Sequence, residues 1–447
     1  MVVKDMGNHF SKLGFVLAAL GSAIGLGHIW RFPYMTGVSG GGAFVLLFLF
    51  LSLSVGAAMF IAEMLLGQST QKNVTEAFKE LDANPKKRWK YAGLLLISGP
   101  LILTFYGTIL GWVLYYLVSI SFNLPSSIQE SEQIFTQTLQ SIGLQSVGLF
   151  SVLFITGWIV SRGIKEGIEK LNLVLMPLLF ATFFGLLFYA MSMDSFSKAF
   201  HFMFDFKPKD LTSQVFTYSL GQVFFSLSIG LGINVTYAAV TDKTQNLLKS
   251  TIWVVLSGIL ISLVAGLMIF TFVFEYGANV SQGTGLIFTS LPVVFGQMGA
   301  IGVLVSILFL LALAFAGITS TVALLEPSVM YLTEKYQYSR FKVTWGLVAL
   351  IFVIGVVLIF SLHKDYKDYL TFFEKSLFDW LDFASSTIIM PLGGMATFIF
   401  MGWVLKKEKL RLLSAHFLGP KLFATWYFLL KYITPLIVFS IWLSKIY

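Results

Sequence analysis

The sequence contains no cysteine and little charge. Its 447 residues include 30 Lys and Arg and 22 Asp and Glu, so 12% of the chain is charged, whereas soluble proteins carry about 25%. Without cysteine, no disulfide, thiolate metal site or cysteine nucleophile is possible. The five histidines are scattered and form no HExxH motif, which argues against a zinc-dependent membrane enzyme. An ordinary soluble enzyme is therefore excluded.

Hydrophobic residues, in contrast, make up 57% of the chain, and the mean hydropathy is +0.82. A membrane-spanning helix needs roughly 20 apolar residues. Eleven apolar stretches predict an all-α polytopic membrane protein, and the first is too long to be a signal peptide. They lie at 13–38, 43–69, 91–122, 145–162, 171–192, 215–240, 248–275, 299–332, 343–362, 376–404 and 422–444.

The distribution of basic residues predicts the orientation of these helices. With the N-terminus inside and the helices alternating, 21 of the 30 Lys and Arg fall in inside segments and seven in outside segments. Cytoplasmic loops of membrane proteins carry such an excess. We therefore expect a cytoplasmic N-terminus and an external C-terminus, and the net charge of +8 needs no nucleic acid to explain it.

Glycine interrupts two of the apolar stretches, at 21–27 (GSAIGLG) and at 226–232 (SLSIGLG). Each glycine costs a helix about 1 kcal/mol relative to alanine, so such clusters favour unwinding. The two breaks fall five helices apart, as in transporters that are built from inverted repeats and bind substrate at broken helices. Close packing of helices through small residues is the alternative interpretation. An ion channel is the rival class, but single-copy broken helices favour a transporter.

Several motifs occur in a fixed order along the chain. They are GLGHIWRFP (25–33), GGGAF (40–44), Gly167 with Pro177 nine residues further on, QVFFSLS (222–228) and AGITS (316–320). Together they resemble the motifs of the neurotransmitter:sodium symporter family, which has the LeuT fold, over nearly the whole chain. Eleven helices are similar to the bacterial amino-acid branch of that family.

This resemblance implies a sodium-coupled symporter that imports an amino acid by alternating access, and not an enzyme. It implies one transmembrane domain (1–447) with a 5+5 inverted repeat, in which helices 1 and 6 are broken at mid-membrane. The first repeat would span 11–192, the second 213–405, and an eleventh helix 421–447. We expect a multi-pass protein of the bacterial plasma (inner) membrane, a monomer or weak dimer, with Na⁺ and no organic cofactor.

The second sodium site of the family matches this chain fully. By resemblance, it maps onto Gly21, Ile24, Ala316, Thr319 and Ser320, all of which have an oxygen available. Carbonyls freed by a helix break and neighbouring hydroxyls suit a hard cation. Taken without the resemblance, the hydroxyls of Thr319 and Ser320 are equally consistent with back-bonding inside a helix.

The first sodium site departs from the family pattern. His28 and Gly258 stand where the family has asparagines, which leaves the Ala23 carbonyl, Ser226 and the substrate carboxylate as oxygen ligands. We predict that the imidazole of His28 replaces this ion, so that one Na⁺ binds, at the second site. A histidine that only fills space is the alternative, and proton-coupled symport is the rival coupling scheme.

The family's chloride site also departs. Gln222, Ser226 and Ser262 match its polar positions, but Phe48 stands in place of a tyrosine. Glu63 resembles the carboxylate that supplies negative charge in chloride-independent members. No strict chloride requirement is expected.

The substrate class follows from Gly25, which stands where amine transporters of this family carry Asp. The substrate must then bring its own carboxylate, for the free amides of the first break and the hydroxyl of Tyr106. A mostly apolar pocket favours a hydrophobic or aromatic amino acid. The expected substrate-binding residues are Ser22, Ala23, Gly25, Gly27, Ile102, Tyr106, Phe225, Ser226, Ser228, Leu231, Ser320, Thr321 and Leu324.

Charged residues at membrane depth are costly and usually functional. By resemblance, Arg31 and Asp382 form an outer gate with Phe225 as its lid, and Tyr106 also belongs to this gate. The usual basic and aromatic inner-gate residues appear as Met6 and His9, opposite Glu334. By the same resemblance, Gly167 and Pro177 mark a local unwinding of the fifth helix that releases the second sodium ion inward.

Overall fold

The computed structural model describes residues 9–278 and 285–439. The helices of the first half are α1 (Lys12–Ala23), α2 (Phe32–Val38), α3 (Gly42–Leu51), α4 (Ala57–Thr70), α5 (Val74–Leu81), α6 (Ala92–Leu95), α7 (Gly99–Val118), α8 (Ile128–Gln140), α9 (Ile142–Ser161), α10 (Lys170–Ala190) and α11 (Phe196–Phe204). Those of the second half are α12 (Ser213–Ser226), α13 (Ile233–Ala239), α14 (Leu247–Glu275), α15 (Leu291–Gln297), α16 (Ala300–Tyr336), α17 (Arg340–Phe360), α18 (Leu377–Asp382), α19 (Met390–Ile399), α20 (Lys407–Ser414) and α21 (Pro420–Phe428).

Short irregular helices join or extend these elements. Those with π geometry are η1 (Gly27–Arg31), η2 (Ser52–Gly56), η5 (Ile164–Glu169), η7 (Leu286–Ser290), η9 (Phe383–Ile389), η10 (Phe400–Val404) and η11 (Leu429–Ile433). The 3₁₀ turns are η3 (Arg88–Tyr91), η4 (Ile120–Phe122), η6 (Pro208–Asp210) and η8 (Lys367–Leu370). Two short strands, β1 (Thr371–Phe372) and β2 (Lys375–Ser376), pair antiparallel. Single π turns inside helices often mark functional sites.

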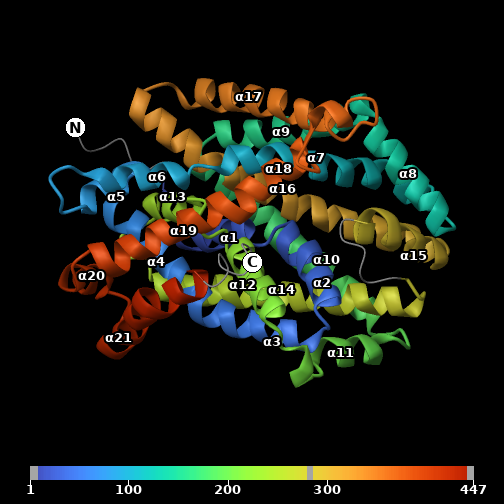
Figure 1. Ribbon diagram of the computed structural model, residues 1–447, viewed down its shortest axis with the longest axis horizontal. Coiled ribbons are helices and arrows are strands. Elements are labelled where there is room, and N and C mark those ends of the chain that lie inside the picture. Colours follow the sequence, from blue (N-terminus) through green and yellow to red (C-terminus); the bar gives the residue numbers. More distant parts are fainter. Residues whose placement is uncertain (1–8, 279–284, 440–447) are drawn as a thin grey trace.

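In Figure 1 most long helices run along the long axis of the molecule, with α1 and α12 in the middle of the view. The helices α9 and α17 lie along one side of the bundle, and α3 and α11 along the other. The loops at one end carry α5 and α20, and those at the opposite end carry α8 and α15. The two broken segments are thus surrounded by unbroken helices.

Nine helical stretches within the described residues are long and apolar enough to cross a membrane. A tenth is the pair Lys12–Ala23 and Gly27–Val38, which is bent by 50° at its break. The predicted segment 215–240 forms two short helices, α12 and α13, separated by the residues of the second predicted break. This pair corresponds to the remaining predicted segment and is not among the ten stretches above. The end of the last predicted segment, 422–444, lies outside the described residues.

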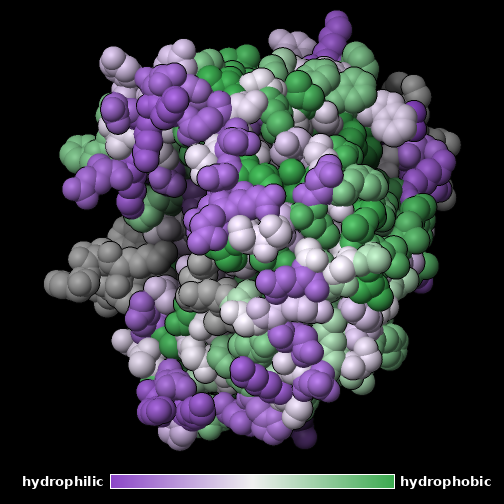
Figure 2. All heavy atoms as spheres, turned by 90° about the vertical axis from the view of Figure 1, so that its right-hand side faces the viewer, coloured by the Kyte–Doolittle hydropathy of each residue, from purple (hydrophilic) through white to green (hydrophobic). Residues whose placement is uncertain are grey.

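The outward faces of the helices are apolar, as contact with lipid requires. On α9 the exposed side chains of Val147, Phe150, Phe154 and Trp158 follow one another at helical spacing. Figure 2 views the end that carries α8 and α15, where hydrophilic residues cover much of the surface and hydrophobic residues gather along one side.

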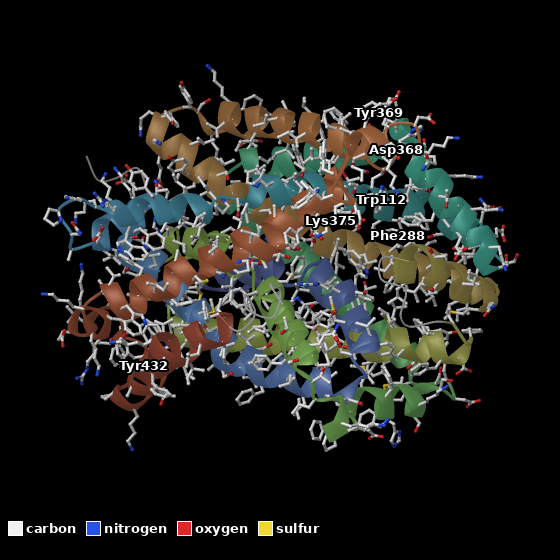
Figure 3. The ribbon with its side chains drawn as sticks, viewed as in Figure 1. Trp112, Phe288, Asp368, Tyr369, Lys375 and Tyr432 are labelled. Carbon is white, nitrogen blue, oxygen red and sulfur yellow. The ribbon has the colours of Figure 1, made fainter. Side chains whose placement is uncertain are left out.

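An aromatic cluster packs between the bundle and the loops of the end that carries α8. The rings of Trp112 and Phe288 meet edge to face with centroids 5.7 Å apart (Figure 3), and Phe135 of α8 stacks on Phe288 at 5.3 Å. The indole of Trp112 donates a hydrogen bond of 3.0 Å to Gln145. These contacts fix α8, a helix that the segment pattern did not predict, against α7 and η7.

Candidate functional site

The first helix break is built as the glycines predict. The helix α1 ends at Ala23, and Ile24 leaves helical geometry with φ −78° and ψ 88°. The amide of Gly25 bonds back to the Ala23 carbonyl at 3.0 Å, and the amide of Leu26 donates to the hydroxyl of Tyr106 at 3.3 Å. A Cβ atom at Gly25 would collide with Ser320 Oγ. Glycine is needed here because the backbone lies against α16.

The second break runs from Leu227 to Gly232. Ser228, Gly230 and Gly232 have φ of +51°, +85° and +69°, a left-handed region that favours glycine. The unusual residue is therefore Ser228, a non-glycine in that region. Its hydroxyl donates to the carbonyl of Ser22 at 2.9 Å, which ties the two breaks together.

The carboxylate of Glu63 holds the second break from the side of α4. One oxygen accepts the amide of Gly230 at 2.7 Å, and the other accepts Asn234 Nδ2 at 2.9 Å. The same amide group of Asn234 also donates to the carbonyl of Leu227 at 3.1 Å. Glu63 thus satisfies backbone freed by the unwinding, as membrane proteins require. These partners differ from the chloride-site role that the sequence suggested for Glu63.

A central cavity of about 30 Å³ lies between the two breaks. It is lined by eleven of the thirteen predicted substrate-binding residues: Ser22, Ala23, Gly25, Gly27, Ile102, Tyr106, Phe225, Ser228, Leu231, Ser320 and Leu324. Three further lining residues, Leu26, Ile233 and Met390, escaped the sequence reasoning. Met390 comes from α19, and nothing in its local sequence marks it as part of the site.

The other two predicted residues, Ser226 and Thr321, do not line this cavity. The hydroxyl of Ser226 accepts a hydrogen bond of 2.9 Å from Gln222 Nε2. The hydroxyl of Thr321 lies 2.7 Å from that of Thr156 on α9. Adjacent positions on a helix point about 100° apart, so Thr321 faces a different neighbour from Ser320.

The residues of the predicted second sodium site lie where α1 meets α16. Ser320 Oγ lies 3.5 Å from the carbonyl oxygen of Gly21, and Thr319 Oγ1 lies 3.0 Å from that of Ala316. A Cβ atom at Gly21 would lie 3.1 Å from the Cβ of Thr319. The two helices therefore approach closely enough to present oxygens from both sides, as the hard-cation interpretation needs.

At the predicted first sodium site, the imidazole of His28 fills the space that a side chain at position 258 would take. His28 is 1% exposed and hydrogen-bonds to the carbonyl of Ala23, an expected ion ligand. A Cβ atom at Gly258 would lie only 2.8 Å from His28 Nε2. Because Gly258 has no side chain, the ring of His28 fits against α14. Among the described residues, His28 Nδ1 has no hydrogen-bond partner.

The polar residues that match the chloride site form a group beside this histidine. Gln222 Nε2 donates to the carbonyl of Gly27 at 2.7 Å as well as to Ser226. Within the described residues, Gln222 Oε1 and Ser262 Oγ are buried without a hydrogen-bond partner. Phe48 packs on Phe32 with ring centroids 4.9 Å apart.

An outer cavity of about 350 Å³ brings the predicted gate residues together. Arg31, Asp382, Phe225 and Tyr106 all line it, and Phe225 and Tyr106 also line the central cavity. The guanidinium of Arg31 lies 5.0 Å from the centre of the Phe225 ring, donates to the carbonyl of Gly221 at 3.4 Å, and is attracted by the carboxylate of Asp382. The Phe225 ring thus lies between the outer and the central cavities.

A cavity of about 410 Å³ near the α5 end contains the predicted inner-gate residues His9 and Glu334. Glu334 accepts hydrogen bonds from the backbone amide and the side chain of Asn73, at 3.3 and 2.5 Å. The same cavity is lined by an ion pair between Glu326 and Arg340. Met6 lies outside the described residues.

The predicted release path shows an irregular turn rather than an open break. Gly167 lies in the π turn η5, and its backbone packs so close to the carbonyl of Ile159 that a Cβ atom would overlap it. Pro177 lies inside α10. Just after Gly167, the carboxylate of Glu169 accepts the hydroxyl of Ser11 at 2.5 Å, which fastens the start of α1 to this turn.

Comparisons with known proteins agree with this architecture. The model of the sodium:neurotransmitter symporter family matches residues 7–132 and 127–447. The chain belongs to this family. An uncharacterized sodium-dependent transporter of Bacillus subtilis, YhdH, is 34% identical over 98% of this chain and 97% of its own length. One of Haemophilus influenzae is 32% identical with the same coverage.

A solved structure gives the same fold. The crystal structure of MhsT in complex with L-phenylalanine matches with a TM-score of 0.89 and 33% identity, over 98% of this chain and 99% of MhsT. The predicted family, the all-helical LeuT-like fold and the assignment as a transporter rather than an enzyme are thereby confirmed. The boundaries of the two repeats stay a prediction.

Proposed function

We propose that this protein is a sodium-coupled symporter that imports a hydrophobic or aromatic amino acid by alternating access. The observation that carries the proposal is the central cavity between two helix breaks, which has unwound backbone beside it and mostly apolar walls. Family membership and the structural likeness to MhsT, which was crystallised with L-phenylalanine, support it.

The first break supplies the recognition of a carboxylate. The backbone from Gly25 to Gly27 lines the cavity beside the hydroxyl of Tyr106. Amides at a helix break favour an anion. Because Gly25 provides no carboxylate to pair with the ammonium group of an amine, the substrate has to bring its own acid group. An amino acid is therefore favoured over a monoamine.

The remaining walls select an apolar side chain. Ile102, Phe225, Leu231, Leu324 and Met390 line the cavity. Its volume of about 30 Å³ is the space of about one water molecule. A large side chain thus requires a wall to move, and the unwound segment that ends at Gly232 is the part with the most backbone freedom.

We further propose that one Na⁺ binds, held by the oxygens of Gly21, Ile24, Ala316, Thr319 and Ser320. The close approach of α1 to α16 supports this assignment. At the first site, the hydrogen bond from His28 to the Ala23 carbonyl occupies an oxygen that a cation would use. Because His28 and Gly258 stand where the family has asparagines, the first site also lacks two amide oxygens.

Alternating access requires that the cavity open to one side at a time. The outer cavity with Arg31 and the inner cavity with His9 lie apart from the small central one, so the chain has a vestibule at each side of the site. The excess of Lys and Arg in alternate loops supports a cytoplasmic position for the end that carries α5. Import by a plasma-membrane protein follows from that orientation and an inward sodium gradient.

Uptake into proteoliposomes tests the proposal. We expect saturable accumulation of L-phenylalanine or L-leucine under an inward Na⁺ gradient, and none when choline replaces Na⁺. Accumulation driven by a pH gradient without Na⁺ would instead support the proton-coupled alternative. The ratio of radiolabelled sodium to substrate should be one, and a ratio of two would overturn the replacement by His28.

A further inference from the structure

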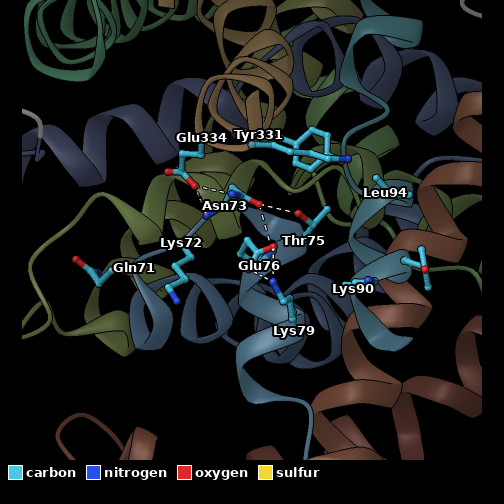
Figure 4. Close-up of a pocket in the computed structure, with 12 residues that line it drawn as sticks. Gln71, Lys72, Asn73, Thr75, Glu76, Lys79, Lys90, Leu94, Tyr331 and Glu334 are labelled. Atoms are coloured by element: carbon cyan, nitrogen blue, oxygen red, sulfur yellow. Dashed lines mark hydrogen bonds and ion pairs between the residues drawn. The ribbon is translucent and has the colours of Figure 1, made fainter. Parts of the chain in front are cut away.

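A pocket of about 640 Å³ lies at the end of the molecule that carries α5 (Figure 4). It is lined by the residues that follow α4, by α5, η3 and α6, and by the last turns of α16, so it lies at the level where spans leave the membrane. Four lysines line it: Lys72, Lys79, Lys90 and Lys335. It lies apart from the substrate cavity, with which it shares no lining residue.

The charges in this pocket do not all cancel. Lys79 pairs with Glu76 at 2.9 Å, and Lys72 pairs with Glu80 at 2.6 Å. Within the described residues, Lys90 and Lys335 form no ion pair with a carboxylate. Glu334 also lines the pocket, so four lysines face three carboxylates and a net charge of +1 remains.

Aromatic rings and hydroxyls position the ammonium groups of Lys90 and Lys335. Lys90 Nζ lies 5.0 Å from the centre of the Tyr91 ring. Lys335 Nζ lies 2.5 Å from the hydroxyl of Tyr331 and 5.1 Å from the centre of the Tyr336 ring. Cation–π contacts of this kind hold lysine side chains in place. The second acidic residue of the lining, Glu334, accepts hydrogen bonds from Asn73, as Figure 4 shows, and also lines the inner cavity.

The edge of the pocket is apolar and accessible. Leu94 lines it and is 46% exposed, and Tyr91 is 61% exposed. Leu95 and Leu101, which follow on the same stretch, are also exposed. Exposed leucines beside tyrosines at the end of a span are typical of the membrane interface. A ligand in this pocket therefore meets positive charge on one side and lipid on the other.

We propose that this pocket binds the phosphate group of an anionic phospholipid through its lysine lining, to which Lys90 and Lys335 contribute, with an acyl chain along Leu94. Basic pockets between spans on the cytoplasmic side bind such headgroups. Free phosphate offers the same oxyanion but has no group for the apolar edge.

Lipid retention tests this proposal on the full chain. Native mass spectrometry of the purified protein, supplied with phosphatidylglycerol and phosphatidylcholine, should show retained phosphatidylglycerol. The variant K90Q/K335Q should retain roughly tenfold less, because each lysine at a membrane surface contributes to the attraction. The matched control is K243Q/K249Q, which removes two exposed lysines at the same end outside the pocket, and it should behave as the wild type.

The outcomes separate the sources of the anion. Unchanged retention in K90Q/K335Q, or equal losses in both double variants, would overturn the site. Release of phosphatidylglycerol by excess inorganic phosphate would show that the pocket takes free phosphate and overturn the lipid assignment. The sodium-dependent thermal stability of K90Q/K335Q checks that the variant is folded. Its sodium-driven uptake is measured in parallel, so that failure of the lipid site can be told apart from failure of the transport function.

Discussion

Two cation positions flank the first helix break, and they differ in their ligands. At the second site, α1 and α16 lie together with Gly21, Thr319 and Ser320 facing one another. At the first, His28 bonds to the Ala23 carbonyl and fills the room beside Gly258. A hard cation needs several oxygens, and this difference in ligands is what the proposal of a single sodium ion rests on. The predictions below test this difference, from the largest expected effect to the smallest.

Thr319→Val should have the largest effect, because it removes an oxygen from the second site while keeping the side-chain shape. We expect uptake at a fixed Na⁺ concentration to fall by about a hundredfold, because loss of a buried group that binds a charge costs about 2–3 kcal/mol. Uptake measured as a function of Na⁺ concentration gives the shift of the activation curve. The control Thr182→Val changes a half-buried threonine of α10, away from the predicted sodium sites, in the same way and should leave the curve in place.

Gly258→Asn should have the next largest effect, since its Cβ atom would lie 2.8 Å from His28 Nε2. Overpacking of this kind costs about 1–3 kcal/mol, and we expect uptake to fall about tenfold. The double variant His28→Asn/Gly258→Asn removes the clash and restores two amide oxygens. It should recover uptake and bring the sodium-to-substrate ratio to two. A double variant as inactive as Gly258→Asn would contradict the exchange of imidazole for ion.

Glu63→Gln tests whether that carboxylate serves the second break or a chloride site. Glutamine keeps an acceptor for Gly230 but turns a donor toward Asn234, which should destabilise the fold by about 1–3 kcal/mol. Thermal unfolding in detergent measures the change, and adding chloride should not restore it. The surface pair of Lys72 and Glu80 provides the control, because Glu80→Gln should cost less than about 1 kcal/mol. Full restoration of stability by chloride would contradict this role and support a place for Glu63 in the anion site.

Ser226→Ala should have the smallest effect on sodium dependence. In the family pattern this hydroxyl is an ion ligand, but here it accepts a hydrogen bond from Gln222. We expect the Na⁺ concentration for half-maximal uptake to shift by less than about threefold, since only one neutral hydrogen bond is lost. A shift as large as that of Thr319→Val would mean that an ion occupies the first site.

The substitutions at 28 and 258 illustrate how far sequence reasoning reaches. Motif alignment predicted that His28 and Gly258 share a site, because ordered motifs fix which positions of a family fold correspond. It did not show that the imidazole occupies the room left by the glycine, since that depends on how η1 packs on α14. Thr321 and Met390 show the same limit. One neighbours Ser320 in sequence yet faces α9, and the other reaches the cavity from a distant helix.

By itself, the sequence determined the membrane class, the eleven segments, the two glycine breaks and the family. Each of these depends on local composition or on ordered motifs, and lipid requires long apolar helices wherever a chain crosses it. Only the tertiary structure decided which polar group satisfies each freed backbone atom. It assigned Glu63 to Gly230 and His28 to Ala23, and it brought Lys90 and Lys335 to one pocket, because most such partners come from helices that are far apart in the chain.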